Sequence, residues 1–358
     1  MLHKNRGRHI DGQARILDIA GERQLADYSI RNHAQPCLLA DIGGTNARFA
    51  LETAPHRFEA ITVLACNAYP DLRSAMAAYL GSPEVRAVFG GQLKHAGLAI
   101  ANPVAGDIVS MTNHHWSFSI EQLRQAMDFE TLLVVNDFTA LAMALPHLRD
   151  DEKVQIGAGT PQAGKVIGLI GPGTGLGVSG IVPAGERWIP LNSEGGHVTF
   201  SPANHAESLL LERIWRDFPH VSAERLISGM GIELMYRVLA ELDGQPAADS
   251  LTAADISQRA ADGRCEICSR TMAHFCGMLG TVAGNLAMTL GATGGVYIGG
   301  GIVPKLGELF TESAFRDRFE AKGRFSRFVA QIPTYLITAQ YPAFLGISAI
   351  LHEHLMPR

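Results

Sequence analysis

The chain has 358 residues, which at about 100–200 residues per domain predicts two domains and excludes a small peptide or mini-protein. Its residues are 47% hydrophobic and 18% charged, which excludes a largely disordered chain. With 35 acidic and 30 basic residues the formal net charge is −5, so bulk attraction to nucleic acid or to an anionic membrane is excluded and a small-molecule partner is expected.

The N-terminal residues and the cysteines predict a cytoplasmic protein. The first 36 residues carry charge throughout and contain no apolar segment before a cleavage site, so no secretory signal is predicted. Residues 271–304 lack Asp, Glu, Lys and Arg, but nine glycines divide them, which predicts a buried helix, a turn and a strand rather than a membrane span. Five scattered cysteines favour a reducing compartment over a disulfide scaffold: Cys37, Cys66, Cys265, Cys268 and Cys276.

The first half of the chain has a mixed pattern of strands and helices. Apolar residues 37–40 predict a strand that runs into a glycine turn at 41–46, and residues 47–51 predict its partner strand. The other elements expected there are a helix over 70–80, strands at 97–101, 108–111 and 131–135, and a helix over 138–145 that stops at Pro146.

The second half opens with the same pattern of a strand, a glycine turn and a second strand. Residues 165–170 predict a strand, residues 171–177 a glycine-threonine turn, and residues 178–182 a second strand. The later elements expected are helices at about 206–217, 229–242, 252–261 and 266–290, a strand at 295–298, a turn at 299–301 and a helix starting near Pro304. The repeat suggests a duplicated α/β domain with a cleft between the copies.

A glycine turn between strands either closes a tight hairpin or brings backbone amides close to a phosphate. At the first turn, Asp41 leaves the strand as a carboxylate suited to a hydrated magnesium ion, and the Thr45 hydroxyl is able to donate to a phosphate oxygen. Because the device occurs twice, we favour phosphate binding over a plain hairpin.

Two better-known nucleotide-binding motifs are matched only in part. Residues 159–166 match a Walker A motif only as far as Lys165, because Val166 replaces the magnesium-binding Ser or Thr and a strand follows. Residues 175–180 spell the dinucleotide pattern, but the residues after them predict a strand and a turn instead of a helix.

Polar residues with possible chemistry follow the apolar strands. Asn136 and Asp137 stand at the predicted end of a strand, where α/β proteins place ligand-binding groups; an Asn-Asp helix cap is the alternative. Glu194 and His197 flank two glycines, which fits a polar site and a surface hairpin equally well.

Two residue pairs resemble metal ligands at first sight. His114 and His115 are adjacent, and Cys265 and Cys268 are three residues apart on a predicted helix. The cysteine pair has no second pair at zinc-finger or zinc-ribbon spacing, and such pairs usually pack in a core, so we expect neither to hold a metal.

Together these segments resemble the bacterial glucokinase family, the hexokinase-like branch of the actin, hexokinase and Hsp70 ATPase superfamily. They lie in the family's order between residues 38 and 346. The matching segments are LLADIGGTNARFAL (38–51), MTNHHW (111–116), VNDFTA (135–140), GPGTGLGV (171–178), EGGHV (194–198), HVSAER (220–225), GGVYIGGGIVP (294–304) and AFLG (343–346).

The resemblance implies an ATP:D-glucose phosphotransferase made of two duplicated actin-like ATPase (ribonuclease H-like) α/β domains that close over the sugar. Asp137 would be the general base that takes the proton of the sugar's 6-hydroxyl as that oxygen attacks the γ-phosphate. Carboxylates, amides and imidazole supply the donors and acceptors that neutral hydroxyls need. The residues expected at the sugar are Asn113, Asn136, Asp137, Glu194, His197 and Glu224.

The resemblance also implies ATP and Mg²⁺ as cofactors, with D-glucose and ATP as partners and a homodimer as the assembly. Asp41 is expected near the metal, through water. The first phosphate loop would be Ala40, Asp41, Ile42, Gly43, Gly44 and Thr45; the second Gly171, Gly173, Thr174 and Gly175; the adenosine side Gly299 and Gly300.

The expected domains are a polar extension of residues 1–36, a small α/β domain of 37–147 with 340–358, and a large α/β domain of 148–339. The extension has no counterpart in typical members of the family, and we assign it no function. The cysteine-rich zinc motif of the related ROK sugar kinases and repressors is absent, which places the chain in the zinc-free glucokinase group.

Two other functions compete with this one. A kinase of the same fold could act on mannose, fructose or an amino sugar, since one changed hydroxyl contact shifts preference by a few kcal/mol. A sugar-responsive regulator would bind glucose without turnover. That protein would need a DNA-binding module, which the polar extension does not supply.

Overall fold

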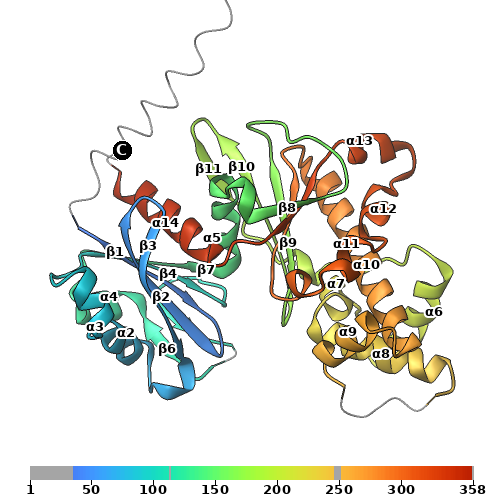
Figure 1. Ribbon diagram of the computed structural model, residues 1–358, viewed down its shortest axis with the longest axis horizontal. Helices are drawn as coiled ribbons and strands as arrows, with labels where there is room; N and C mark the ends of the chain where they lie inside the picture. Colours follow the sequence, from blue (N-terminus) through green and yellow to red (C-terminus); the bar gives the residue numbers. More distant parts are fainter. Residues whose placement is uncertain (1–34, 113, 246–250, 357–358) are drawn as a thin grey trace, which may run out of the picture. The chain divides into compact units, whose positions relative to one another are not determined.

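The computed structural model describes residues 35–112, 114–245 and 251–356, and the chain divides into two compact units (Figure 1). The first unit comprises the chain up to Leu98, residues 105–134 and the C-terminal residues from Leu351. The second comprises residues 99–104 and 135–350. The expected extension lies almost entirely outside the described residues, and the domain boundaries expected at 147 and 340 stay predictions.

The first unit is built on a five-stranded sheet with the order β3-β2-β1-β4-β7. β1 and β2 pair antiparallel around the first glycine turn, and β2 pairs antiparallel with β3. The strands are β1 (Cys37–Ile42), β2 (Asn46–Ala54), β3 (Arg57–Ala65), β4 (His95–Ile100) and β7 (Thr131–Asn136), with a separate hairpin of β5 (Ile108–Ser110) and β6 (Ser117–Ser119).

The position of each strand follows from its side chains. β1, at the centre of the sheet, is almost continuously apolar and buried, whereas the edge strand β3 is half-exposed. The short helices each begin at a side chain that caps the helix: Asp71, Ser82 and Ser119 accept hydrogen bonds from the first turn. These helices are α2 (Leu72–Leu80), α3 (Pro83–Val88) and α4 (Ile120–Ala126).

The second unit repeats this topology. Its sheet has the order β11-β10-β9-β12-β13-β8, in which β9, β10 and β11 form an antiparallel meander and β12 runs parallel to both β9 and β13. The duplicated α/β fold is therefore confirmed, with β8 as an added edge strand. The strands are β8 (Lys153–Ile156), β9 (Ile167–Pro172), β10 (Leu176–Ala184), β11 (Arg187–Pro190), β12 (Val296–Ile298) and β13 (Thr334–Ile337).

Two helices cover opposite faces of this second sheet (Figure 1). Two glycines of β9 face the two helices. A β-carbon placed on Gly168 would contact Leu286 of α10 (Glu266–Leu290), whereas one placed on Gly171 would lie 2.6 Å from the Phe138 ring of α5 (Asp137–Ala144). Helices of the second unit also include α6 (His205–Ile214), α7 (Ala223–Leu226), α8 (Gly229–Leu242), α9 (Ala253–Ala261), α11 (Glu308–Thr311), α12 (Phe315–Glu320), α13 (Ser326–Ala330) and α14 (Pro342–Leu355), which ends in the first unit.

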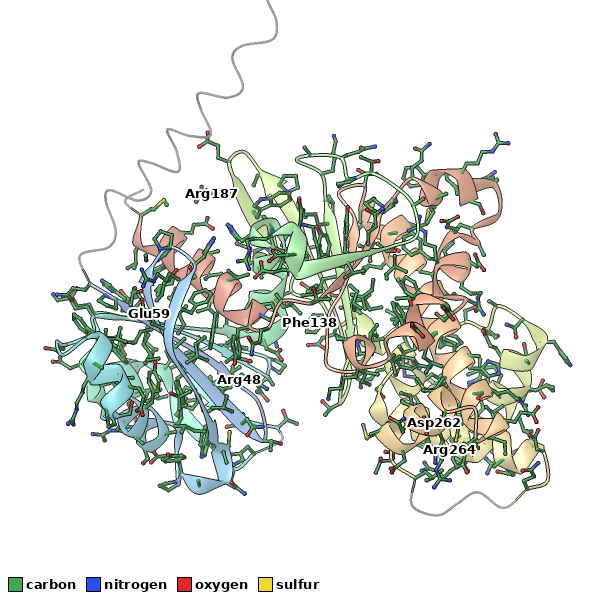
Figure 2. The ribbon with its side chains drawn as sticks, viewed as in Figure 1. Arg48, Glu59, Phe138, Arg187, Asp262 and Arg264 are labelled. Atoms are coloured by element: carbon green, nitrogen blue, oxygen red, sulfur yellow. The ribbon has the colours of Figure 1, made fainter. Side chains whose placement is uncertain are left out.

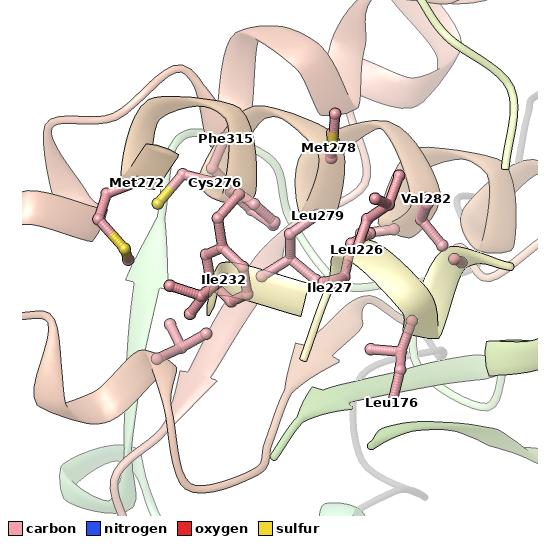
Figure 3. Packing of buried hydrophobic residues seen from close by; sticks show 14 of the residues in the cluster. Leu176, Leu226, Ile227, Ile232, Met272, Cys276, Met278, Leu279, Val282 and Phe315 are labelled. Atoms are coloured by element: carbon pink, nitrogen blue, oxygen red, sulfur yellow. The ribbon is translucent and has the colours of Figure 1, made fainter. Parts of the chain in front are cut away.

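The main hydrophobic core of the second unit surrounds α10. Figure 3 shows Met272, Leu279 and Val282 of this helix among Ile232 of α8 and Phe315 of α12, all buried. The charge-free residues 271–304 contain most of α10, a turn and β12, as predicted. Among the described helices, none combines the length and the hydropathy that crossing a bilayer requires.

One predicted helix differs from the structure. Residues 303–305 form only a short 3-10 turn near Pro304, and α11 starts later, at Glu308. The turn cannot continue smoothly into α11, because Gly307 between them has a φ of 54° and a backbone that is not helical. The strand β3 was not predicted at all.

A buried ion pair connects three helices of the second unit. The Glu207 side chain of α6 is 0% exposed, and its carboxylate lies 2.7 Å from Nη1 of Arg318 on α12. Arg318 also donates two hydrogen bonds to the Thr281 hydroxyl of α10, while the backbone N–H of Ala203 donates to Glu207. The charges are therefore both paired and hydrogen-bonded, as burial requires.

We expect Glu207→Gln to lower the free energy of unfolding by about 3 kcal/mol, because it leaves the Arg318 guanidinium without its buried counter-charge. Urea unfolding measures this change. Glu212→Gln, an exposed position on the same helix, is the control and should change stability by less than about 0.5 kcal/mol. Equal stabilities of the two variants would show that the pair does not stabilise the fold.

Candidate active site

Asn136 and Asp137 lie where β7 passes into α5. Asn136 is the N-cap: its side-chain oxygen accepts hydrogen bonds from the backbone N–H groups of Phe138 and Thr139. The helix cap considered from the sequence is therefore present, and it places Asp137 in the first turn. The Asp137 carboxylate accepts hydrogen bonds from Asn136 Nδ2 (3.1 Å) and the Phe138 N–H (2.8 Å), which orient it.

Asn136 also contacts a residue that the sequence analysis did not single out. Its Nδ2 donates to the backbone oxygen of Asn102, which follows the end of β4. β4 and β7 are neighbours in the sheet, and this hydrogen bond joins the segments at their carboxyl ends. The rule that selected Asn136, a polar residue after a buried strand, would have selected Asn102 as well.

Glu194, His197 and Glu224 form one acid–imidazole cluster. His197 Nε2 lies 4.0 Å from Glu194 Oε2, and His197 Nδ1 lies 3.8 Å from Glu224 Oε1. His197 is carried by a short 3-10 turn, and Glu224 by the first turn of α7, whose N-cap is Ser222. The imidazole thus stands between two carboxylates, a group of donors and acceptors suited to hydroxyl groups.

Glu224 is also attached to the second glycine loop. Its Oε2 accepts a hydrogen bond of 2.8 Å from the backbone N–H of Leu176, immediately after the loop. A β-carbon on Gly175 would lie 2.4 Å from the same carboxylate oxygen, so the carboxylate would have to shift if residue 175 carried a side chain. The loop and the acid–imidazole cluster are therefore in direct contact.

Three backbone segments meet at this loop. The N–H of Gly229, in the first turn of α8, donates to the oxygen of Gly173 (2.9 Å), and the N–H of Gly299 donates to Ile170 (2.8 Å). Gly300 has a φ of 78° and packs so closely on Pro172 that a β-carbon would collide with its carbonyl oxygen. The structure thus brings the predicted second phosphate loop and the predicted adenosine-side turn together.

Phe138 holds α5 against the same loop. Figure 2 labels this residue beside the second sheet, and its ring would collide with a β-carbon on either Gly171 or Gly177. A hydrogen bond of 3.3 Å from the Thr139 hydroxyl to Asn192 joins α5 to the segment that leads to the acid–imidazole cluster. The residue after Asp137 is therefore packed on the glycine loop.

A cavity of about 440 Å³ lies next to the acid–imidazole cluster, within the size range of small-molecule sites. Its lining includes His197, Glu224, Ser222, His220 and Arg225. A larger cavity of about 620 Å³, between α9, α10 and α11, contains none of the predicted site residues. Chemistry rather than size therefore selects the smaller cavity as the candidate site.

The first glycine loop, in the first unit, is a tight turn between β1 and β2. The N–H of Gly43 donates to Asn46, and the N–H of Cys66 donates to Thr45. Asp41 is partly buried and forms an ion pair of 3.0 Å with Arg48 across the hairpin, which the sequence analysis did not predict. Burial raises the pKa of Asp41 above its usual value, while Arg48 acts in the opposite direction.

The residues present fit a hydrated Mg²⁺ better than a metal enclosed by protein. In the described part of the chain, no group of three or more His, Cys, Asp and Glu side chains is placed to hold a metal ion. Mg²⁺ keeps several waters and commonly needs only one or two carboxylates besides substrate phosphates. Asp41 is such a carboxylate, although its Oδ2 is engaged by Arg48.

The expected sugar contact Asn113 lies outside the described residues. Of its neighbours in the first unit, Trp116 donates its indole N–H to Tyr69, and His115 lies 3.1 Å from the oxygen of Pro70. These contacts anchor the segment that follows Asn113.

Comparison with known proteins identifies relatives over nearly the whole described chain. The family model described as Glucokinase matches residues 38–354. A "Bifunctional protein glk" of Burkholderia thailandensis is 59% identical over 323 residues, which are 90% of this chain but 50% of that protein. The chain thus spans about half the length of the first curated relatives that it matches.

Two further relatives match over more than nine-tenths of their own length. A "Glucokinase" of Chromobacterium violaceum is 52% identical over 91% of this chain and 92% of its own. The crystal structure of a glucokinase from an Antarctic psychrotroph has a TM-score of 0.81 and 38% identity, and the match covers 89% of this chain and 99% of that one.

We expect Gly177→Ala to lower the free energy of unfolding by about 1–3 kcal/mol, because the added methyl group overlaps the Phe138 ring. Gly173→Ala, in the same loop, is the matched control: nothing lies within 4 Å of its added β-carbon. In urea unfolding, Gly177→Ala combined with Phe138→Ala should cost less than the sum of the single changes. Strict additivity would show that ring and glycine are not in contact.

Proposed function

The chain belongs to the glucokinase family, and we propose that it transfers the γ-phosphate of ATP to the 6-hydroxyl of D-glucose, giving glucose 6-phosphate and ADP. The observation that carries the proposal is the junction at Glu224. One carboxylate contacts both an imidazole in a polar cluster and a glycine loop of the kind that binds phosphates. Sugar and nucleotide groups would meet there.

The sugar's hydroxyls would be held by Asn136, Glu194, His197 and Glu224. A hexose offers only neutral hydroxyl groups, each of which donates one hydrogen bond and accepts others. The carboxylates accept, and His197 does both in its neutral form; the Asn136 amide would have to exchange part of its present hydrogen bonds for a sugar hydroxyl. Such a site would discriminate against sugars that leave one of these partners unpaired.

Asp137 would act as the general base. Its carboxylate is oriented by two hydrogen bonds from its own turn and carried on α5, which packs on the glycine loop through Phe138. It would accept the proton of the 6-hydroxyl while that oxygen attacks the γ-phosphorus and the bond to the β-phosphate oxygen breaks. The reaction needs positioning and charge stabilisation rather than a covalent nucleophile.

The nucleotide would be held mainly by backbone groups. The loop around Gly173–Gly175 and the turn at Gly299–Gly300 expose a backbone without side chains, which lets phosphate or ribose oxygens come close. Asp41 and Thr45 of the first loop would contribute a carboxylate and a hydroxyl. A Mg²⁺ ion bound with the nucleotide supplies positive charge that neutralises the phosphates.

Two competing functions and two further expectations belong to the proposal. A kinase for another hexose shares every feature above except the sugar preference. A regulator that binds sugar without turnover would need neither a positioned carboxylate nor paired glycine loops. The homodimer and the cytoplasmic location stay predictions.

ADP release with Mg-ATP, measured with glucose, mannose, fructose, N-acetylglucosamine and no sugar, tests the function. We expect a clear preference for glucose and little release without sugar, because water is a poor substitute for a positioned hydroxyl. A preference for another sugar would replace the substrate but keep the reaction. Glucose binding in calorimetry without any turnover would favour the regulator.

We expect Asp137→Asn to lower kcat by about 10²–10⁴-fold, since the amide keeps the shape but cannot accept the proton. Glucose binding, measured by calorimetry, should persist. Asp151→Asn, an exposed carboxylate, is the control and should leave kcat unchanged. Unchanged turnover in Asp137→Asn would remove Asp137 from the mechanism.

A further inference from the structure

Two cysteines lie side by side at the turn between α9 and α10. Figure 2 labels Asp262 and Arg264, which form an ion pair in this turn, and Cys265 follows as the N-cap of α10. Cys268 is three residues further on, in the first turn of the helix. Cys265 is partly exposed and Cys268 is buried, and both are free thiols.

The two thiols are already in hydrogen-bond contact. The backbone N–H of Cys268 donates to Cys265 Sγ at 3.4 Å, so the sulfur occupies the place that a serine oxygen takes in an ordinary N-cap. The side chains of the two residues are also hydrogen-bonded to each other. Residues three apart on a helix have β-carbons about 5–6 Å apart, and a rotation of the partly exposed N-cap residue Cys265 would bring this separation into the disulfide range.

The surroundings of Cys265 favour its thiolate. Burial acts to raise the pKa of its thiol, but hydrogen bonds from Cys268 and Ile267 and the charge of Arg259 outweigh it and lower the pKa below the usual value. For Cys268, burial and its neighbour Cys265 raise the pKa to about 12. The Cys265 sulfur is thus the nucleophile, and the Cys268 sulfur is the second thiol, which reacts after it.

The other three cysteines have the opposite character. They are buried, and burial raises the pKa of each thiol: to about 12 in Cys37, to about 11 in Cys276, and upward in Cys66. Cys276 is on the same helix but eight residues beyond Cys268, which is about 12 Å along the axis and beyond disulfide reach. Reactivity is therefore concentrated in the pair.

We propose that Cys265 and Cys268 are a redox-active dithiol that a hydroperoxide oxidises reversibly to an intramolecular disulfide. The Cys265 thiolate attacks the terminal peroxide oxygen, the O–O bond breaks, a sulfenic acid forms, and the other oxygen leaves after protonation as an alcohol, or as water when the oxidant is hydrogen peroxide. The Cys268 sulfur then attacks the sulfenic sulfur, the S–S bond forms, and the sulfenic oxygen leaves as water. Two electrons pass from the dithiol to the peroxide, and an added dithiol returns them by exchange.

The site is convenient to test, because Arg264 and Arg270 bracket both cysteines in a single tryptic peptide, residues 265–270. The full-length protein, in buffer with a chelator, is treated with one equivalent of hydrogen peroxide. Free thiols are then blocked with N-ethylmaleimide, and the digest is analysed by mass spectrometry. We expect this peptide to lose two hydrogen atoms and to take up no maleimide, and to take up two after dithiothreitol treatment.

Variants assign the two steps. Cys268→Ser should stop at the sulfenic acid, which dimedone traps on Cys265. Cys265→Ser, in which serine retains the N-cap, should leave Cys268 reduced. Cys276→Ala is the matched control and should form the disulfide as the unchanged chain does. Oxidation of Cys37, Cys66 or Cys276 at an equal or higher rate, or a peptide that stays fully alkylated, would overturn the proposal; neither readout depends on kinase activity.

Discussion

The hydrogen bond between the Leu176 N–H and the Glu224 carboxylate is the contact on which the arrangement of the candidate site depends. Through it, a glycine loop between two strands touches an acid–imidazole cluster that begins 18 residues and ends 48 residues after Leu176. Glycine at position 175 lets the carboxylate come this close, because an added β-carbon would lie 2.4 Å from it and displace it. Glycine in this turn therefore serves the contact with the carboxylate as well as the turn itself.

Close packing against glycines also fixes the position of α5, the helix that carries Asp137. The Phe138 ring leaves no room for side chains at Gly171 and Gly177, and α14 approaches α5 so closely that a β-carbon on Gly346 would collide with the Ala140 oxygen. A close-packed helix holds a side chain more precisely than a loop does. Several glycines of the second unit therefore serve packing around the site, in addition to any contact with a phosphate.

Local patterns predicted the duplicated strand–turn–strand device, and the structure confirms it as two sheets of equivalent order. The prediction of a helix starting near Pro304 was wrong because Gly307 interrupts the helical backbone. The Asp41–Arg48 ion pair was not predicted because it forms only when the two strands of the hairpin pair. The role of Glu224 came from family resemblance, whereas phosphate binding by the glycine loops was favoured from the residues themselves, because the strand–turn–strand pattern occurs twice. The contact between Glu224 and Leu176, 48 residues apart, has no local signal in the sequence. Asn102, in contrast, is a polar residue after a buried strand, and the rule that selected Asn136 would have found it.

The shared contact at Glu224 makes one measurement decisive: calorimetric binding of glucose and, separately, of the non-hydrolysable ATP analogue AMPPNP to the unchanged protein and to Glu224→Ala. Removing the carboxylate takes an acceptor from the sugar cluster and frees the Leu176 N–H at the loop. A hydrogen bond to a charged group contributes about 1.5–3 kcal/mol, so we predict that both affinities fall by roughly tenfold or more. Loss of glucose binding with unchanged AMPPNP affinity, in a variant that remains folded, would contradict the account.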